Sequence, residues 1–307
     1  MESLLTPFLQ LFSLLVLGFF LARKGVFTEA FNKSLATLLL RWSLPALILV
    51  SMQKEFTPDR FSGALVLLGI SWGVYGLSIL VALLWGRFST GLTDVKGIFQ
   101  FALIFSNVGF MGFPILEALW GREILFWAAI YNIPFHFLVF TLGVYLVSGG
   151  NKDRKFHPKE LLNPGLLATL AGFIAFLFSW KFPSPIHQTL TMVGGLTTPL
   201  SMILIGSLLA RSSVRRTLKT PILWGLSFIR LLVLPLAVLF FMKFLKQPPE
   251  FTKVAVIITA MPAAANLTLL ATEYSPKPEA AGQMVFVSTL GALLTIPILV
   301  FLGEMVW

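Results

Sequence analysis

Two short segments of the chain combine polar side chains with residues that interrupt helices, and both lie inside long apolar stretches. They read SNVGFMGFP at positions 106–114 and MPAAAN at 261–266. Proline removes a backbone hydrogen bond and clashes with the preceding turn, and glycine costs about 1 kcal/mol inside a helix. Each segment therefore predicts free backbone N–H and C=O groups beside an asparagine amide, a combination that suits a small polar ligand. The residues that we expect to form this site are Asn107, Gly109, Pro114, Pro262 and Asn266.

The elements that carry these segments are expected to be membrane-spanning helices. Of the 307 residues, 57% are hydrophobic and only 12% are charged, about half the usual charged share. Uncharged runs at 63–86, 161–180 and 283–303 match the roughly 20 residues that a helix needs to cross a bilayer. These runs are uniformly apolar, whereas the strands of membrane barrels alternate. The composition therefore predicts an all-α integral membrane protein.

Ten spans account for the apolar stretches. We place them at 4–22, 32–52, 62–86, 96–119, 124–148, 161–180, 187–210, 221–242, 252–273 and 280–303. With the N-terminus outside, 14 Lys and Arg residues fall on the cytoplasmic side and 7 on the outer side, as the positive-inside rule favours. Glu2 precedes the first apolar stretch and Arg23 and Lys24 follow it, the reverse of a signal peptide. We therefore expect a retained first helix, with both termini outside.

An internal repeat is indicated by matches between the two halves of the chain. Two residue pairs match at a separation of 154 positions and the polar segments at 153: Pro45 with Pro199, Gly18 with Gly172, and Ser106 with Thr259. The predicted halves are 1–148 and 161–307, joined by a cytoplasmic linker at 149–160. Each half holds five spans, an odd number, so the halves would have opposite orientations. Inverted repeats of this kind are typical of secondary transporters.

Spans 4 and 9 of this scheme contain the two polar segments near their centres. Breaks at matching places in two inverted halves predict discontinuous helices that face each other at the bilayer midplane. The N-termini of their half-helices would carry positive dipole ends, which favour an anionic or carboxylate-bearing ligand. The alternative is a pair of proline kinks with a packing role, and the pattern alone leaves it open.

Ionisable residues inside the spans are further candidates, because a charge at mid-membrane costs about 2.5 kcal/mol or more. Arg41 in span 2 is a candidate for pairing with a substrate carboxylate, with snorkelling to an interface or a glutamate partner as the alternative. Arg230 in span 8 is a second candidate for the same role. Glu117 and Glu273 are the candidates for binding a coupling cation or proton, with solvation near an interface as the alternative. His136 in span 5 is expected to be a packing residue rather than a proton relay.

Several functional classes are disfavoured by what the chain lacks. It has no cysteine, which removes thiol nucleophiles and Cys-ligated metals. No HExxH or GxxxxGK[ST] motif and no pair of intramembrane aspartates occurs, so neither an enzyme nor a fused ATPase is indicated. Basic loop segments such as KDRKFHPK and RSSVRRTLK explain the net charge of +10 without nucleic acid. We expect no enzymatic activity, no cofactor and no metal site.

The same segments resemble a known family. SNVGFMGFPILEALWG, followed by AAIYNIPFHFLVFTLGVYLV, resembles the fourth and fifth spans of the auxin efflux carrier family, and AMPAAANLTLLATEY resembles its ninth. WSLPALIL in span 2, LNPGLLATLAGF in span 6 and a last span with Ser288 and Thr289 also fit, in the family's order and over nearly the whole chain. The bacterial branch is the most similar, because the long cytoplasmic loop of many plant members is missing here.

The resemblance implies ten helices in two inverted five-helix repeats, with spans 4 and 9 crossing at a substrate site. It also implies a transport domain that moves like an elevator against a scaffold domain. By position, it carries Asn107, Pro114, Pro262 and Asn266 to the crossover and Tyr131 to the lining of the site. The implied substrates are organic anions, such as auxin-like acids and small carboxylates. We therefore expect a secondary transporter in a bacterial cytoplasmic membrane.

Two other functions stay open at this point. A sodium-coupled symporter of the bile-acid-transporter type would need clustered oxygen ligands around the crossover. A membrane sensor would bind the same ligand without transporting it. The expected partners are a small organic anion and the lipid bilayer, and no nucleic acid. Coupling to protons or sodium, and a homodimer rather than a monomer, are left open by the sequence.

Overall fold

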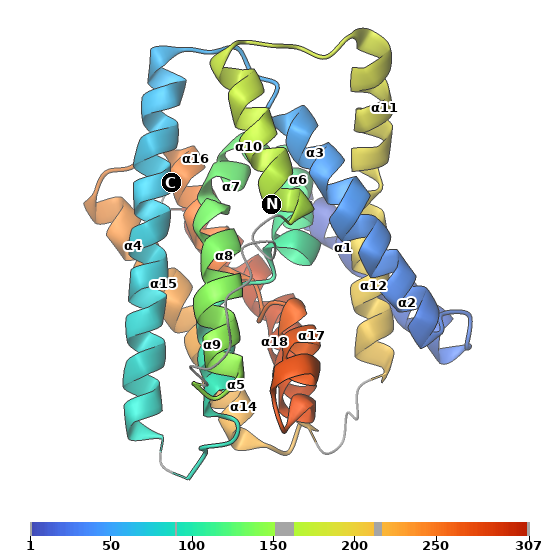
Figure 1. The fold of residues 1–307 in the computed structure, drawn as a ribbon, viewed down its shortest axis with the longest axis vertical. Coiled ribbons are helices and arrows are strands. Elements are labelled where there is room, and N and C mark those ends of the chain that lie inside the picture. The colour runs from blue at the N-terminus through green and yellow to red at the C-terminus, as the bar shows by residue number, and fades with distance from the viewer. Residues whose placement is uncertain (1, 90, 151–162, 212–216, 306–307) are drawn as a thin grey trace. The chain divides into compact units, whose positions relative to one another are not determined.

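The computed structural model describes residues 2–89, 91–150, 163–211 and 217–305 (Figure 1). Within these ranges the chain is helical, and its only strand-like pairing is one isolated antiparallel bridge between Ser106 and Ala263. The expected all-α architecture is therefore confirmed for this part of the chain. The linker expected at 149–160 and the two basic segments lie mostly outside the described residues.

Seven helical stretches among the described residues are long and apolar enough to cross a membrane. They are Thr6–Arg23, Glu29–Ser51, Pro58–Phe88, Ile124–Val147, Ser184–Ala210, Pro221–Phe244 and Pro278–Glu304. These coincide with the first, second, third, fifth, seventh, eighth and tenth expected spans. The sixth expected span is a shorter helix, Pro164–Leu177, and the fourth and ninth are each divided into separate helices.

The chain forms two compact units, each built from three stretches of sequence. Unit 1 comprises Met1–Leu67, Gly109–Ile133 and Lys159–Arg211, and unit 2 comprises Leu68–Val108, Pro134–Pro158 and Ser212–Trp307. Each unit therefore draws on both halves of the chain. The helix α4 (Pro58–Phe88) runs from the first unit into the second.

The helices of each unit follow in chain order, with π-helical segments labelled η. Unit 1 contains α1 (Glu2–Arg23), α2 (Glu29–Leu38), η1 (Leu39–Ser43), α3 (Leu44–Ser51), α6 (Phe113–Trp120), α7 (Ile124–Tyr131), α10 (Pro164–Leu177), α11 (Ser184–Gly195) and α12 (Thr197–Arg211). Unit 2 contains α5 (Lys96–Ile104), α9 (Val144–Val147), α14 (Pro221–Phe228), η5 (Ile229–Val233), α15 (Leu234–Phe244), α16 (Pro249–Ala260), α17 (Asn266–Tyr274) and α18 (Pro278–Glu304). At the unit boundaries lie η2 (Val108–Gly112) and α8 (Ile133–Leu138), and η3 (Val139–Gly143) follows α8.

Three of the π-helical segments, η1, η2 and η5, end two residues before a proline, and η1 and η5 show the bond that precedes it. The N–H of Leu44 donates to the carbonyl of Leu39, and the N–H of Leu234 donates to the carbonyl of Ile229. Each of these bonds spans five residues and ends one residue before a proline, which has no N–H to continue the helix. The widened turns let both spans continue past the prolines without a break.

Glycines bring the helices of unit 1 into backbone contact. A Cβ atom on Gly18 of α1 would lie 2.0 Å from the carbonyl oxygen of Ile203 in α12, and one on Gly206 would lie 1.9 Å from that of Leu15. A Cβ atom on Gly172 of α10 would lie 2.6 Å from the Cβ atom of Met52, at the end of α3. Small residues at helix contacts are the usual means of close packing in membrane proteins.

Side-chain hydrogen bonds join the same helices of unit 1. The hydroxyls of Ser43 and Thr197 lie 2.7 Å apart across a sequence separation of 154 positions. The amide of Asn32 donates to the hydroxyl of Ser207 at 2.9 Å. Such bonds supply directional contacts between helices that have little hydrophobic drive to associate inside a bilayer.

Unit 2 is packed around α5, α16 and α18. Helix α5 contacts α9, α17, α18 and η5, and α16 contacts α15, α18 and η5. Phe105, at the end of α5, packs its ring against Phe101 and against Tyr75 of α4. In Figure 1, α17 and α18 lie side by side at the red end of the colour bar, as their contacts require.

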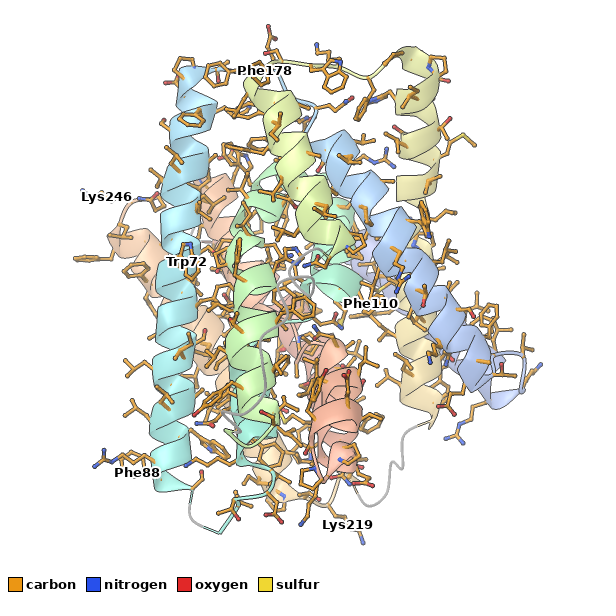
Figure 2. The ribbon with its side chains drawn as sticks, in the orientation of Figure 1. Trp72, Phe88, Phe110, Phe178, Lys219 and Lys246 are labelled. Carbon is orange, nitrogen blue, oxygen red and sulfur yellow. The ribbon has the colours of Figure 1, made fainter. Side chains whose placement is uncertain are left out.

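Large apolar side chains cover much of the outer surface of the helices. Trp72 and Phe88, labelled on α4 in Figure 2, are 45% and 78% exposed. Leu294 of α18 is 73% exposed. Exposed apolar residues at this density are unusual for a soluble protein and typical of a surface that faces lipid.

Candidate functional site

The ninth expected span is broken by proline. Helix α16 ends at Ala260, and Met261 has an extended backbone with φ −65° and ψ 148°. The ring of Pro262 excludes the helical conformation from the residue before it, which accounts for this end. The chain becomes helical again at Asn266, where α17 begins.

The fourth expected span is broken before its glycines and its proline. Helix α5 ends at Ile104, and Phe105 is extended with φ −103° and ψ 119°. Ser106 and Asn107 follow, and both residue types compete with helical hydrogen bonds through their own side chains. Pro114 lies further on, inside the first turn of α6, where proline is tolerated. The predicted break is therefore confirmed, but it lies at 105–107 and Pro114 does not cause it.

The two breaks are joined by a short antiparallel bridge within unit 2. The N–H of Asn107 donates to the carbonyl of Pro262 at 2.8 Å, and the N–H of Ala264 donates to the carbonyl of Phe105 at 3.0 Å. Ser106 and Ala263 are the paired residues between these two bonds. We call residues 105–107 and 261–265 the crossover. Its bridge gives protein partners to backbone groups that the breaks release from the helices, as the lack of water at this depth demands.

Other freed backbone groups of the crossover are held by side chains from two neighbouring spans. Arg230 of η5 donates through Nη1 to the carbonyl of Leu103 at 2.9 Å and through Nε to that of Met261 at 3.2 Å. Its Nη2 donates to the hydroxyl of Ser106. From α18, the hydroxyl of Ser288 accepts the N–H of Ala263 at 3.1 Å. Arg230 is 1% exposed, and the three acceptors named here all belong to unit 2.

The start of α17 has no side-chain cap and carries one polar atom that these contacts leave without a partner. Ala265 stands at the capping position and offers no side-chain cap to the first N–H groups of the helix. The Oδ1 atom of Asn266 is buried and has no hydrogen-bond partner among the described residues. Turning the amide about its last torsion exchanges oxygen for NH₂ at that point. The position can therefore serve a carboxylate oxygen or the hydroxyl of a protonated acid.

The remaining expected site residues lie in unit 1. Gly109 is packed so that a Cβ atom would meet Leu44 at 3.3 Å. Pro114 is buried at the start of α6, and Tyr131 is fully buried at the end of α7. Arg41, in η1, is exposed and makes no hydrogen bond or ion pair with the described residues.

The two candidate glutamates differ in their surroundings. In unit 1, Glu117 accepts from Nε of Arg122 at 2.9 Å through one carboxylate oxygen and from the hydroxyl of Thr198 at 2.6 Å through the other. In unit 2, Glu273 is exposed near the end of α17 and accepts from the hydroxyl of Tyr274. Protein donors thus hold both oxygens of Glu117, which suits a structural ion pair. Within the described ranges, no group of three or more His, Cys, Asp or Glu residues could hold a metal ion.

The comparison with known proteins decides the class of this arrangement. A model of the membrane transport protein family matches residues 3–160 and 151–300. The chain belongs to this family. It is the auxin efflux carrier family that the sequence motifs resemble, so that resemblance is confirmed. The protein is therefore a membrane transporter rather than an enzyme, and its apolar helices make it a multi-pass membrane protein.

Three relatives of this transporter cover almost its entire length. An uncharacterized transporter of Methanothermobacter thermautotrophicus is 30% identical over 94% of this chain and 95% of the relative. The uncharacterized transporter YfdV of Escherichia coli is 22% identical over 97% of both chains. A putative malonate transporter of Rhizobium meliloti is 24% identical over 98% of this chain and 95% of the relative.

Sequence reasoning found the crossover of this transporter but not the residues that hold it. Arg230 was a candidate for pairing with a substrate carboxylate, whereas its described bonds go to the carbonyls of Leu103 and Met261 and to the hydroxyl of Ser106. An arginine inside a predicted span indicates a structural or functional role, but the sequence does not predict which groups it binds. His136 is buried and packs its ring against Phe135 at 5.6 Å between centroids, as a packing residue would.

Proposed function

We propose that this transporter is a secondary carrier of small organic anions, with the crossover of unit 2 as its substrate site. Malonate and related small carboxylates are the first candidates, since a relative that matches 98% of the chain is named a putative malonate transporter. The observation that carries the proposal is the start of the nine-residue helix α17, which has no side-chain cap and carries an asparagine whose side-chain oxygen is buried. Such an end attracts negative charge through its N–H groups and its dipole.

The broken backbone lets this site bind an anion reversibly, which a cationic side chain in direct contact with the anion would hinder. A carboxylate bound by N–H groups and an amide is held without a charge that would pair permanently with it. A carrier must bind its substrate on one side of the membrane and release it on the other, so the bound state must not be too stable. Half-helices ending at the membrane midplane are used in this way by secondary transporters.

The same proposal includes ten helices in two inverted five-helix repeats, and contacts in unit 1 support it. Ser43 and Thr197 are 154 positions apart and bind each other, as equivalent residues on a pseudo-two-fold axis would. The contact of Gly18 with Ile203 also has a counterpart. The residue 154 positions after Gly18 is Gly172, and the residue 154 positions before Ile203 is Leu49. These two residues are also in contact, because the Cα atom of Leu49 lies 3.9 Å from the Cβ position of Gly172.

A second pair of contacts follows the same exchange. Asn32 binds Ser207, and the corresponding shift predicts a contact between residues 186 and 53. The observed contact joins Nδ1 of His187 to Oε1 of Gln53 at 2.9 Å, one residue from that position. Repeated contacts of this kind support an inverted repeat more strongly than the proline and glycine matches alone.

We infer an elevator-type mechanism on the same grounds. Such a mechanism needs a compact body that carries the substrate site and another body to move against, and the chain forms two compact units. The crossover and its supports, Arg230 and Ser288, all belong to unit 2. We place the carrier in a cytoplasmic membrane with both termini outside, as the distribution of basic residues favours. Arg41, Glu117, Glu273 and Tyr131 remain candidates for substrate or ion contacts.

The test is thermal stabilisation of the detergent-purified protein by malonate, first in potassium and then in sodium chloride. A ligand at 100 times its Kd stabilises the folded state by about 2.7 kcal/mol. We expect malonate to raise the melting temperature without sodium, and Asn266→Ala to remove most of that shift. Loss of one hydrogen bond to a charged ligand weakens binding by about 1.5–3 kcal/mol, or roughly 10- to 150-fold.

A second asparagine provides the matched control. Asn163 caps α10 in unit 1 by accepting the N–H of Leu166 at 2.9 Å. Asn163→Ala should lower stability by about 1 kcal/mol and leave the malonate shift unchanged. Stabilisation that appears only in sodium would favour a sodium-coupled symporter instead. Stabilisation without malonate uptake into proteoliposomes would favour a sensor, and no carboxylate response at all would contradict the anion proposal.

A further inference from the structure

Arg230 places a buried positive charge between two helix ends that are negative. Helix α5 ends at Ile104 and helix α16 ends at Ala260. The carbonyls that Arg230 binds belong to Leu103, in the last turn of α5, and to Met261, the residue that follows α16. Each helix C-terminus carries roughly half a negative charge, and the guanidinium carries a full positive one. The two ends and the arginine therefore sum to roughly zero.

No buried carboxylate in the described part of unit 2 takes over this role. The described acidic residues of the unit are all exposed, namely Asp94, Glu250, Glu273, Glu279 and Glu304. The C-terminal ends of α5 and α16 are thus negative groups that contact the guanidinium directly. A buried charge is held in this way when several oriented dipoles replace the water that it has lost.

The consequence concerns the N-terminus of α17. Without the guanidinium, the negative ends of α5 and α16 would lower the potential at the crossover and oppose the positive end of α17. With it, the positive end stays uncancelled. We propose that Arg230 is a positioning residue that sets the charge preference of the crossover for anions by neutralising these two helix ends. This inference rests on the proposed function, because it assigns Arg230 to the same site.

The arrangement is asymmetric between the two halves of the chain. At the repeat offset of 154 positions, the place of Arg230 in span 8 corresponds to Gly76 in span 3, beside Tyr75. Tyr75 packs its ring against Phe105, with 6.3 Å between the centroids. One half thus supplies a guanidinium to the crossover and the other an aromatic ring. A crossover built from similar halves thereby receives the charge that neutralises its two helix ends from one side only.

The test measures the charge preference without using a substrate. The chain has no cysteine, so a single introduced thiol can be labelled without background. Ala265→Cys places a thiol at the cap of α17, four residues after Met261 and so within about 14 Å along the chain. Its rates with anionic methanethiosulfonate ethylsulfonate and cationic methanethiosulfonate ethyltrimethylammonium give a charge-preference ratio. In a buried setting this ratio responds to a charge at that range.

We expect Arg230→Gln to lower the anion-to-cation ratio at position 265 at least threefold, and Arg230→Lys to restore most of it. Thr272→Cys, exposed on the same helix, is the matched control and should keep its ratio in both backgrounds. An unchanged ratio in Arg230→Gln would overturn the proposal. Equal losses in the glutamine and lysine variants would also overturn it, because they would assign the effect to hydrogen-bond geometry.

A comparison within the parent protein covers the case in which Arg230→Gln does not fold. The thiol at position 265 must then prefer the anionic reagent more than the thiol at position 272 does, and equal preferences would overturn the proposal. Binding provides a separate readout. Malonate and its monomethyl ester differ by one charge, so Arg230→Gln should weaken the dianion several-fold more than the monoanion. Failure of the parent to bind either would contradict the proposed function and leave the labelling result standing.

Discussion

The two units join the halves of the chain in different ways. In unit 1 the joining helices are continuous, and α1 and α12 meet through Gly18 and Gly206 with their backbones in contact. In unit 2 the joining helices are broken, and a two-bond bridge with Arg230 and Ser288 holds the ends. Continuous helices satisfy their own backbone groups and need only shape to pack. Broken helices bring polar backbone inside, which is why we propose the substrate site in unit 2.

The arginines of the two units sharpen this contrast. Arg41 and Arg230 both lie in π-helical segments shortly before a proline. Arg41 is exposed, whereas Arg230 is buried and donates to three acceptors. Among the described residues of unit 1, no carbonyl accepts a hydrogen bond from Arg41 in the way that those of Leu103 and Met261 accept from Arg230. Burial of an arginine in a span therefore depends on the acceptors that another element brings to it.

Replacing Arg230 with leucine should have the largest effect on stability. The change leaves the carbonyls of Leu103 and Met261 and the hydroxyl of Ser106 without their donor, and an unsatisfied buried group costs about 1–3 kcal/mol. We expect a loss of at least about 3 kcal/mol in the free energy of unfolding, measured in a mixed-detergent titration. Arg230→Lys should lose less, because it keeps one donor. A loss below about 1 kcal/mol would contradict the described bonds.

A glycine of unit 1 should show the next largest effect. In Gly206→Ala the new methyl group would lie 1.9 Å from the carbonyl oxygen of Leu15, so α1 and α12 must move apart. Overpacking of this kind costs about 1–3 kcal/mol. Gly73→Ala is the matched control, since nothing lies within 4 Å of its Cβ position, and it should be neutral or stabilising. Similar losses in both variants would show that helix propensity, and not close packing, sets the effect.

The hydroxyl pair of unit 1 should contribute less. A double-mutant cycle of Ser43→Ala and Thr197→Val removes one hydrogen bond between side chains 2.7 Å apart. We expect a coupling of about 1 kcal/mol in the free energy of unfolding. Ser43→Ala combined with Thr169→Val is the control, because the Thr169 hydroxyl binds the carbonyl of Gly165 in its own helix. That second pair should be additive, and coupling as large as in the first would refute the assignment.

The helices and the crossover were predictable because their causes are local. Uninterrupted apolar runs of sufficient length leave a helix as the only stable choice in a bilayer, and Pro262 excludes the helical conformation at the residue before it. The break of span 4 was predicted from its glycines and from Pro114, yet it occurs at Phe105 and Ser106. A proline in the first turn of α6 does not interrupt that helix, so Pro114 indicated the region of the break but not the residues at which it occurs.

The partners of the crossover could not be predicted, because they depend on packing between distant segments. Arg230 reaches Ser106 across 124 positions of sequence, and Ser288 is one of several small polar residues in span 10. The spacing of apolar residues in the sequence does not predict which face of η5 packs against the end of α5. The exposed place of Arg41 has the same cause, since its local sequence resembles that of Arg230 and only the surrounding elements differ.

Arg41 gives the smallest expected effect and the sharpest test of its predicted role. Arg41→Gln should change the free energy of unfolding by less than about 0.5 kcal/mol, because the side chain is exposed and has no partner among the described residues. If Arg41 contacts a substrate carboxylate, as its place in span 2 suggests, the variant should bind malonate a few-fold more weakly and its monomethyl ester almost unchanged. If Arg41→Gln changes neither the affinity for malonate nor that for the monomethyl ester, Arg41 is a surface residue of unit 1 without a role in binding. The anion preference would then depend on the crossover and on Arg230.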